Sequence, residues 1–525
     1  MNKIEDGNNL TDNNMMDDNK YFDDKKYTAA VINLGCKVNR YEADSMKELM
    51  ANAGILIVEP EDIADFYIVN TCSVTNIAER KSRQMLRRAK RRNPEAFVIA
   101  AGCYVNAAHE KLLELDFVDA VIGNDNKKNI VKVLDECIKV KYQKADKAAD
   151  IEHASNNVDI YTEISASNSF EEMGGLTSSY LDHQRAYIKI QDGCNQFCSY
   201  CIIPYTRGRI RSREPLSIID EITGLARSGV KEFVLTGIHI SSYGKDIYDK
   251  SVSSFAERME GIGEGDAKPD EFVCRDGNDI PAEYSDKTMS VNGKPITDLA
   301  DIVCAISDIP EVERVRLGSL EPRIITKDFL DRLKKAEKLC PHFHLSLQSA
   351  CNETLKRMNR KYSIEEYMEC VADIRRYYNK PAITTDVIVG FPGETEEEFH
   401  ATVENLKKLE LYEIHVFKYS VRHGTVAEKL PCQVPENIKN ERSDVLLELT
   451  AEQKLRYESS LAGLSDEVLV EEEVEGASDY GKALGERELH FERGSKMFTG
   501  HTKRYVKVNV ESDRDIVGEI VTYTF

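Results

Sequence analysis

The stretch QDGCNQFCSYCIIP, residues 191–204, gathers three cysteines, Cys194, Cys198 and Cys201, into one short loop. Three thiolates at this spacing can bind three irons of a 4Fe-4S cluster, whereas a closed ferredoxin-type site supplies a fourth cysteine. A structural zinc site and three unrelated core cysteines are the alternatives. Structural zinc needs four ligands, usually as two separated pairs, and no other cysteine lies close in sequence. We therefore expect a cluster whose fourth iron is open.

An open iron can be chelated by the amino and carboxylate groups of S-adenosylmethionine, which an electron from the cluster then splits to a 5′-deoxyadenosyl radical. The C-x3-C-x2-C spacing of this loop resembles the signature of the radical SAM enzymes. We therefore predict that the loop binds a 4Fe-4S cluster and S-adenosylmethionine.

The composition indicates a globular, reduced protein of several domains. A chain of 525 residues with 41% hydrophobic residues is too long for one core and should contain about three domains. No apolar run approaches the length that spans a bilayer, and the N-terminus lacks the order of a signal peptide. The 13 cysteines argue for reduced thiolates used on metal and against disulfides. We expect a cytoplasmic protein with no membrane partner.

The formal charge of -21 taken alone argues against a nucleic-acid partner. Basic residues nevertheless cluster at 80–92, 207–213 and 503–507, while acidic residues gather in the N-terminal extension, after Lys250 and around 471–475. Local patches decide where RNA can bind.

Residues 1–27 are rich in Asn and Asp, and we expect a disordered tail. Residues 28–140 contain apolar runs at 29–34, 66–70 and 97–101, each followed by a helical pattern, which predicts an open parallel α/β sheet. Each run ends in a cysteine: Cys36, Cys72 and Cys103. Because the carboxyl ends of parallel strands meet at one crevice, these three thiolates could form a second cluster site. Alternatively, they are small buried residues at strand ends.

The helix that follows Cys72 is strongly basic. A solvated helix face would need no partner. Beside a crevice that binds clusters, however, its cations are suitable for RNA phosphates, and we assign Arg87, Arg88 and Arg91 to RNA binding.

Residues 141–180 lack periodicity and predict a linker. Strand patterns then recur at 186–190, 232–235, 312–317, 342–347, 383–389 and 414–419, with helical patterns between them. This alternation over residues 181–430 predicts a complete or partial parallel (β/α) barrel. The loops after its strands should face the cofactor, although ordinary turns are the alternative. Our candidate cofactor contacts are Thr236, Gly237, Glu321, Gly390 and Pro392.

Two further segments complete the chain. Residues from about 247 to 293 mix Gly, Asp, Glu and Ser, which predicts a surface insertion in the core. A helical connector at 431–461 leads to short alternating strands at 462–525, typical of a small five-stranded β-barrel that binds RNA. We assign Lys503, Arg504 and Lys507 to RNA binding, with a structural cap as the alternative.

From Thr28 to Phe525 the chain resembles the radical SAM methylthiotransferases, which pair an N-terminal cluster domain with a radical SAM core and a TRAM domain. Within that family, NLGCKVNRYE (33–42), RLGSLEP (316–322), HLSLQS (344–349) and LKRMNR (355–360) resemble the branch that acts on N6-threonylcarbamoyladenosine in tRNA. Ala350-Cys351 and the insertion depart from the family pattern, but neither touches the six cysteines.

The resemblance implies methylthiolation of N6-threonylcarbamoyladenosine at position 37 of tRNA, with two 4Fe-4S clusters and S-adenosylmethionine as cofactors. A splayed anticodon-loop base could enter such a site cheaply. The expected partners are tRNA, a reductant such as flavodoxin or ferredoxin, and a sulfur donor, and we expect a monomer. The alternatives are isopentenyladenosine or a ribosomal-protein aspartate as the substrate, and a non-catalytic iron-sulfur protein that binds RNA.

Overall fold

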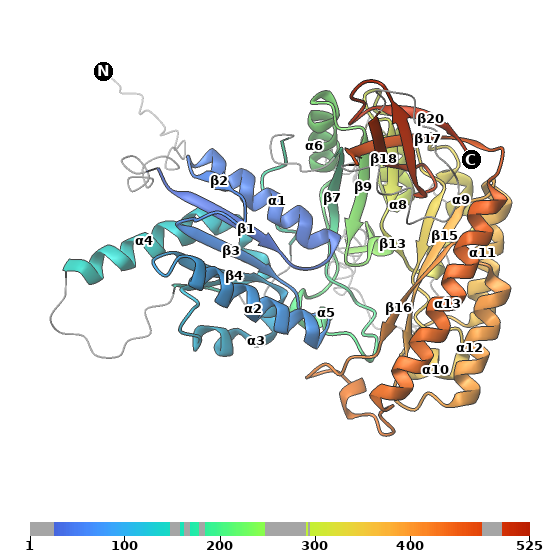
Figure 1. The fold of residues 1–525 in the computed structure, drawn as a ribbon, viewed down its shortest axis with the longest axis horizontal. Helices are drawn as coiled ribbons and strands as arrows, with labels where there is room; N and C mark the ends of the chain where they lie inside the picture. The colour runs from blue at the N-terminus through green and yellow to red at the C-terminus, as the bar shows by residue number, and fades with distance from the viewer. Residues whose placement is uncertain are drawn as a thin grey trace, which may run out of the picture.

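The structure is a computed structural model that describes residues 26–146, 158–161, 169–177, 184–246, 290–291, 294–474 and 496–525 (Figure 1). The predicted tail lies outside the described residues except for Lys26 and Tyr27. The predicted α/β architecture with parallel sheets is confirmed. No helix in the described ranges is both long and apolar enough to cross a membrane.

The N-terminal domain is a six-stranded sheet in the order β2-β1-β3-β4-β5-β6, in which all strands are parallel. Its strands are β1 (Thr28–Asn33), β2 (Leu56–Val58), β3 (Phe66–Thr71), β4 (Phe97–Gly102), β5 (Ala120–Ile122) and β6 (Val158–Ile160). Its helices are α1 (Lys37–Asn52), α2 (Asn76–Arg92), α3 (Cys103–Leu113), η1 (Asn124–Asn129) and α4 (Ile130–Asp146). Separate apolar clusters cover the two faces of the sheet, as is usual for parallel sheets.

This domain extends beyond the predicted boundary. Helix α4 continues to Asp146, and β6 pairs with β5, although both ranges fall partly or wholly in the stretch 141–180 for which we predicted a linker. The sheet therefore takes in part of that stretch.

The central domain is a partial barrel of parallel strands with helices on its outer side (Figure 1). Its strands are β7 (Arg185–Asp192), β8 (Arg211–Ser212), β9 (Glu232–Gly237), β12 (Arg314–Leu317), β13 (Ser319–Leu320), β14 (His342–Leu345), β15 (Ala382–Val389) and β16 (Glu413–Lys418). The short β8 is antiparallel, and a bridge from Val315 to Leu339 joins the two halves of the barrel. The helices are α5 (Ile203–Thr206), α6 (Pro215–Arg227), η4 (Ile240–Ser242), α8 (Leu299–Ser307), η7 (Pro322–Ile324), α9 (Lys327–Leu333), α10 (Asn352–Arg357), α11 (Ile364–Tyr377), α12 (Glu396–Leu409) and η8 (Ala427–Lys429).

Side chains alternate between the two faces of each barrel strand. On β7, Ala186, Ile188 and Ile190 belong to the apolar core under the outer helices. The residues between them, such as Tyr187 and Lys189, therefore lie on the concave side, which we call the inner face.

The C-terminal domain follows a long helix, α13 (Glu436–Ser460), within the range predicted as a helical connector. Its described strands form one antiparallel sheet in the order β19-β18-β17-β20. They are β17 (Ser465–Glu473), β18 (Lys496–Thr502), β19 (Lys507–Ser512) and β20 (Ile520–Thr524). Where we predicted five strands, the described residues thus form four.

Most of the predicted insertion lies outside the described residues, but its end does not. Ser290–Val291 (β10) pairs with Lys294–Pro295 (β11), and Val291 is buried in the core of the central domain, where β10 packs against α6. The prediction that the whole segment is a surface insertion is therefore wrong at this end.

Candidate functional site

The three cysteines of the stretch 191–204 lie in the loop between β7, which ends at Asp192, and α5, which begins at Ile203, and all three are free thiols. Burial raises the pKa of Cys201 to about 12, with further contributions from the neighbouring Cys198 and Cys194 thiols. The backbone amide of Cys201 donates to the Cys198 carbonyl at 2.9 Å, which tightens the turn. The structure thus brings the three cysteines of this set together.

One half-buried arginine, Arg360, contacts this loop. Arg360 Nη1 donates to Cys198 Sγ at 3.3 Å, and Arg360 Nη2 donates to the Ser346 carbonyl at 2.9 Å. The neighbouring Asn359 Nδ2 donates to the Phe197 carbonyl at 2.9 Å. These contacts hold the loop against the chain segment that follows α10.

The other three cysteines meet at the carboxyl edge of the N-terminal sheet. Cys36 is the N-cap of α1, Cys72 follows β3, and Cys103 is the first residue of α3. All three are free thiols. Burial raises the pKa of Cys72 to about 11, with contributions from its neighbours Cys103 and Cys36. Residues that are 31 or more positions apart in the sequence are therefore gathered at one crevice.

Arg207 connects this second set to the central domain. Its Nε donates to Cys103 Sγ at 3.1 Å, and its Nη2 donates to Asn39 Oδ1 at 2.9 Å. The Nη1 atom donates to Glu42 at 2.8 Å and to Asp192 at 3.1 Å. Asp192 immediately precedes the loop of Cys194, so one side chain links the two cysteine sets.

Glu42 on α1 is the counterpart of Arg207 and has no exposed surface. It accepts from Lys189 at 2.8 Å and also pairs with Lys127. Burial alone would raise the pKa of Glu42, but Arg207, Lys127 and Lys189 hold it well below its usual range. A carboxylate paired with three cations fixes α1 against β7, with which it packs.

The N-terminal domain also reaches the opposite edge of the barrel. Asn76 Nδ2 donates to the Val421 carbonyl at 2.8 Å, and Arg422 Nη1 donates to Asn76 Oδ1 at 2.9 Å. Since Val421 follows β16 and α1 packs on β7, this domain spans the open side of the partial barrel.

The two cysteine sets suit clusters better than single ions. Four-coordinate zinc holds its thiolates within about 4 Å of one another. Within the described part of the chain, neither cysteine set brings three ligand atoms within 4.8 Å of one another, whereas His344, Asp386 and His415 do. The thiolates of a cubane bind different irons and are spread more widely. Three free, neighbouring thiols at each site therefore fit a 4Fe-4S cluster with one open iron.

The inner face of the barrel is polar and largely cationic. Arg185, Arg314 and Arg316 surround Glu232, at distances of 3.1, 3.6 and 2.9 Å. The C-terminal domain covers this end of the barrel, where Lys503 and Tyr505 contact Arg316. The Tyr505 ring lies 4.6 Å from the Arg316 guanidinium.

The residues predicted to contact the cofactor lie at the ends of three strands or directly after them. Thr236 and Gly237 end β9, Glu321 follows β13, and Gly390 and Pro392 follow β15, so all lie toward the carboxyl ends of their strands, as Cys194 does. Glu321 interacts electrostatically with Cys194.

The two glycines have a packing role in addition. A Cβ at Gly390 would lie 2.3 Å from Lys439 Cγ, and one at Gly237 would lie 2.9 Å from the Gln191 carbonyl oxygen. The space that a side chain would need at these two positions is therefore already occupied by Lys439 and by the backbone of Gln191.

The residues predicted to bind RNA differ in their surroundings. Arg87, Arg88 and Arg91 are exposed on α2. Lys507 is also exposed. Lys503 pairs with Glu467 at 2.9 Å.

The assignment of Arg504 to RNA is wrong. Its side chain is buried, it pairs with Asp466 at 2.8 Å, and it donates to the carbonyls of Lys380 and Asn379. These contacts bind the C-terminal domain to the barrel, so its guanidinium is not available to a phosphate.

Sequence reasoning missed most of the charged network. Lys37 and Glu42 lie in NLGCKVNRYE, His344 in HLSLQS and Arg360 in LKRMNR, so the signal was present in segments already singled out. Arg207 lay in a basic cluster interpreted only as a local patch.

Comparison with known proteins agrees with this division of the chain. The model of the Radical SAM superfamily matches residues 188–406, which contain Cys194, Cys198 and Cys201. The model described as Uncharacterized protein family UPF0004 matches residues 28–123, which contain the other three cysteines.

Curated relatives match over most of the chain. The chain is 33% identical to threonylcarbamoyladenosine tRNA methylthiotransferase MtaB of Bacillus subtilis, over 94% of this chain and 92% of that protein. It is 35% identical to the protein of the same name from Aquifex aeolicus, over 84% and 92%. It is 30% identical to tRNA-2-methylthio-N(6)-dimethylallyladenosine synthase of Clostridium botulinum, over 93% and 92%.

Proposed function

The chain belongs to the radical SAM tRNA methylthiotransferases, and on this premise we propose that it converts N6-threonylcarbamoyladenosine at position 37 of tRNA to its 2-methylthio derivative. The observation that carries the proposal is the polar inner face of the barrel, where Lys37, Arg316, His344, Asp386 and His415 come together.

We assign a 4Fe-4S cluster to Cys194, Cys198 and Cys201, which would hold it where S-adenosylmethionine binds and which lie in the part of the chain that matches the Radical SAM superfamily. We assign a second 4Fe-4S cluster to Cys36, Cys72 and Cys103, because these thiols are free and gathered at one crevice. When bound, the groups supply a 5′-deoxyadenosyl radical and a sulfur for methylation, which acid–base side chains cannot provide at the unactivated C2–H of adenine.

The protein's own contribution is to position two sites and exclude water. Arg207 and Glu42 clamp the two cysteine sets to one interface with buried ion pairs. The N-terminal domain covers the open side of the barrel, and the C-terminal domain, with Tyr505, covers the end of the barrel at Arg316. A target base held between them would be shielded from solvent.

The choice of substrate follows from polarity. The threonylcarbamoyl group offers a carboxylate, amides and a hydroxyl, which can pair with the charged side chains of the inner face. A dimethylallyl group would leave these side chains desolvated and unpaired, and such mismatches discriminate strongly between substrates. Because the relative from Clostridium botulinum is named for dimethylallyladenosine, tRNA bearing that nucleoside is the competing substrate to test.

The experiment compares three substrates with the anaerobically reconstituted enzyme: tRNA bearing threonylcarbamoyladenosine, tRNA bearing dimethylallyladenosine, and the ribosomal protein. Mass spectrometry of nucleosides and peptides identifies the product. We expect a methylthio product from the first tRNA only. Equal turnover of the prenylated tRNA, or turnover of the ribosomal protein alone, would refute the substrate while leaving the radical chemistry intact.

Two cysteine variants separate the sites. Cys198→Ala should abolish both 5′-deoxyadenosine and methylthio product, because it removes a ligand of the S-adenosylmethionine site. Cys72→Ala should still cleave S-adenosylmethionine while forming no methylthio product. Loss of 5′-deoxyadenosine in both variants would contradict two separate sites.

A further inference from the structure

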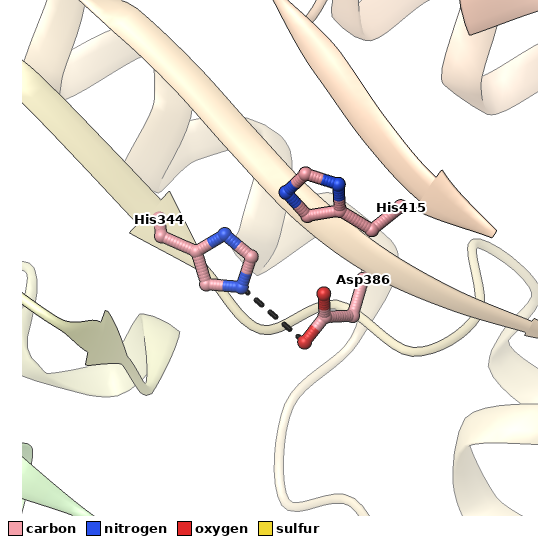
Figure 2. A group of neighbouring side chains, drawn as sticks. All are labelled: His344, Asp386 and His415. Carbon is pink, nitrogen blue, oxygen red and sulfur yellow. Dashed lines mark ion pairs between the residues drawn. The ribbon is translucent and has the colours of Figure 1, made fainter. Parts of the chain in front are cut away.

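Three neighbouring strands bring two imidazoles and one carboxylate together on the inner face (Figure 2). Asp386 on β15 is the register partner of His415 on β16, and His344 lies on the adjacent β14. His344 Nε2 is 3.3 Å from Asp386 Oδ2, and the two imidazole rings stack with centroids 5.6 Å apart. His415 is exposed, and the other two are half-buried. A ligand can therefore reach this group.

The hydrogen bonds fix the orientation of His344. Its Nδ1 lies 2.9 Å from Thr384 Oγ1, so the Thr384 hydroxyl can donate to Nδ1 while Nε2–H donates to Asp386. Burial would raise the pKa of Asp386, but His344 and His415 lower it, so the carboxylate is ionised at neutral pH. It can accept further hydrogen bonds on its remaining lone pairs.

Lys37 of the N-terminal domain adds the free positive charge. Its ammonium group interacts electrostatically with groups on four different strands: Arg316, Arg185, Asp386 and Glu232. Desolvation of the ring lowers the pKa of His415, and the charge of Lys37 lowers it further. Lys37 is an exposed side chain, and no carboxylate in the described ranges lies within ion-pair distance of it.

Two kinds of ligand could occupy this group. Two imidazoles and a carboxylate are a donor set that divalent transition metals accept. However, Lys37 and Arg316 would repel a cation, and Asp386 is already engaged by His344. The same cations attract an anion. The charges around the group therefore favour a carboxylate ligand with hydrogen-bond donors of its own.

We propose that Lys37 and His415 bind the carboxylate of an amino-acid substituent on the target adenosine, while Asp386 accepts from its amide or hydroxyl group. This assignment rests on the proposed function and names the residues that select the substrate. Threonylcarbamoyl carries all of these groups, whereas dimethylallyl carries none. The subsite is composite, since Lys37 comes from the N-terminal domain and the other two residues from the barrel.

The test measures binding of synthetic anticodon stem-loop RNAs by the reconstituted full-length protein. The RNAs carry threonylcarbamoyladenosine or the same nucleoside with its carboxylate converted to a carboxamide. Wild-type protein should bind the carboxylate form about 10- to 100-fold more tightly, as expected for hydrogen bonds to a charged group. Lys37→Met and His415→Gln should each reduce this ratio roughly 5- to 10-fold, with carboxamide binding unchanged.

Three controls make the result specific. His400→Gln changes an exposed histidine on α12 and should keep the wild-type ratio. Lys37→Arg should retain most of the ratio, because it keeps the charge. Iron content is measured for every variant, since Lys37 adjoins Cys36. If Lys37→Met loses iron, then His415→Gln decides the question, because it lies on a barrel strand.

The outcomes separate this inference from the proposed function. Wild-type protein that converts the threonylcarbamoyl tRNA but does not distinguish carboxylate from carboxamide would overturn the subsite alone, as would variants that keep the wild-type ratio. Stoichiometric binding of Mn²⁺ or Zn²⁺ that His415→Gln abolishes would replace it with a metal site. Conversion of dimethylallyladenosine in place of the threonylcarbamoyl substrate would refute the proposed function and the subsite together.

Discussion

Arg207 donates from Nε to Cys103 Sγ across 3.1 Å, although Arg207 belongs to the barrel and Cys103 to the N-terminal domain. The same guanidinium binds Glu42 and Asp192, and it has no exposed surface. A positive charge and a hydrogen bond at a cysteine sulfur are both means by which proteins raise the potential of a bound cluster. Docking of the two domains is therefore coupled to the electrostatics of the second cysteine site.

Arg207→Gln should lower both the stability of the protein and the reduction potential of the cluster that we propose at Cys36, Cys72 and Cys103. The substitution leaves Glu42 and Asp192 buried with fewer cationic partners, and losing one partner of a buried pair costs about 3–5 kcal/mol. Thermal unfolding and an EPR-monitored redox titration of the reconstituted protein measure the two effects.

The matched control is Arg209→Gln, two residues away, where the side chain is exposed and stacks over Phe197. We expect little change in either measurement. Arg207→Lys should recover part of the potential because it keeps the charge. Equal reduction potentials of the cluster in Arg207→Gln and wild-type protein would show that the contact between Arg207 and Cys103 does not affect the cluster's reduction potential.

Arg504→Ala should destabilise the protein without a specific effect on RNA. The variant loses a buried pair with Asp466 and two bonds to backbone carbonyls, which should cost about 2–4 kcal/mol and lower the Tm. Lys507→Ala, in the same domain, should change stability by less than about 0.5 kcal/mol, because the side chain is exposed. A Tm for Arg504→Ala equal to that of Lys507→Ala would contradict the docking role.

The sequence predicted elements with long apolar runs and missed those defined by tertiary contacts. The runs at 66–70 and 383–389 became β3 and β15 with their centres in place. Strands β2, β5 and β6 have three residues each, too few for a periodic pattern. Arg504 was assigned to RNA because a buried arginine and an exposed one look alike in a sequence. Only the fold shows that Asp466 and two carbonyls surround it.

The candidate site divides in the same way. Local spacing predicted the set Cys194, Cys198 and Cys201, and strand-end positions predicted the second set, Cys36, Cys72 and Cys103. The charged partners could not be paired, since Arg207 and Glu42 are 165 positions apart. No local pattern relates such residues, and their pairing follows from how α1 packs on β7.

Glu171 predicts a measurable dependence of stability on pH. Burial raises the pKa of Glu171 to about 7, and in the described ranges its Oε2 atom has no hydrogen-bond partner. The folded state thus prefers the protonated acid. Its contribution is complete below the unfolded pKa of about 4.5 and is lost as the pH rises through 7.

Glu171→Gln mimics the protonated acid at every pH, so the variant should match wild-type stability near pH 4, below the unfolded pKa, and exceed it at pH 8. The difference at pH 8 should reach at most about 3 kcal/mol. Thermal unfolding at both pH values measures it. A Tm difference that does not change with pH would exclude titration of this residue.

Arg87, Arg88 and Arg91 on α2 are exposed, and this helix begins where the N-terminal domain meets the loop after β16. If they contact RNA phosphates, the triple reversal Arg87→Glu/Arg88→Glu/Arg91→Glu should weaken tRNA binding. It should also reduce the slope of log K against log salt by about 2–3. The control Lys407→Glu/Lys408→Glu, on the exposed face of α12, should keep both. An unchanged slope in the triple variant would remove α2 from the RNA-binding surface.

The end of the predicted insertion gives two deletions with different outcomes. A Cβ at Gly244 would lie 2.1 Å from the Thr297 carbonyl oxygen, so the chain before the insertion lies against the chain after it. Replacing residues 251–289 with a short Gly-Ser linker should therefore leave the Tm and iron content near the wild-type values, because closing a loop of different length costs little.

Deleting 251–292 also removes Val291, which is buried against the core, and should cost about 1–3 kcal/mol more. Val291→Ala in the full chain should lower the Tm in the same direction. Equal unfolding temperatures for the two deletions would show that the hairpin of β10 and β11 does not support the barrel.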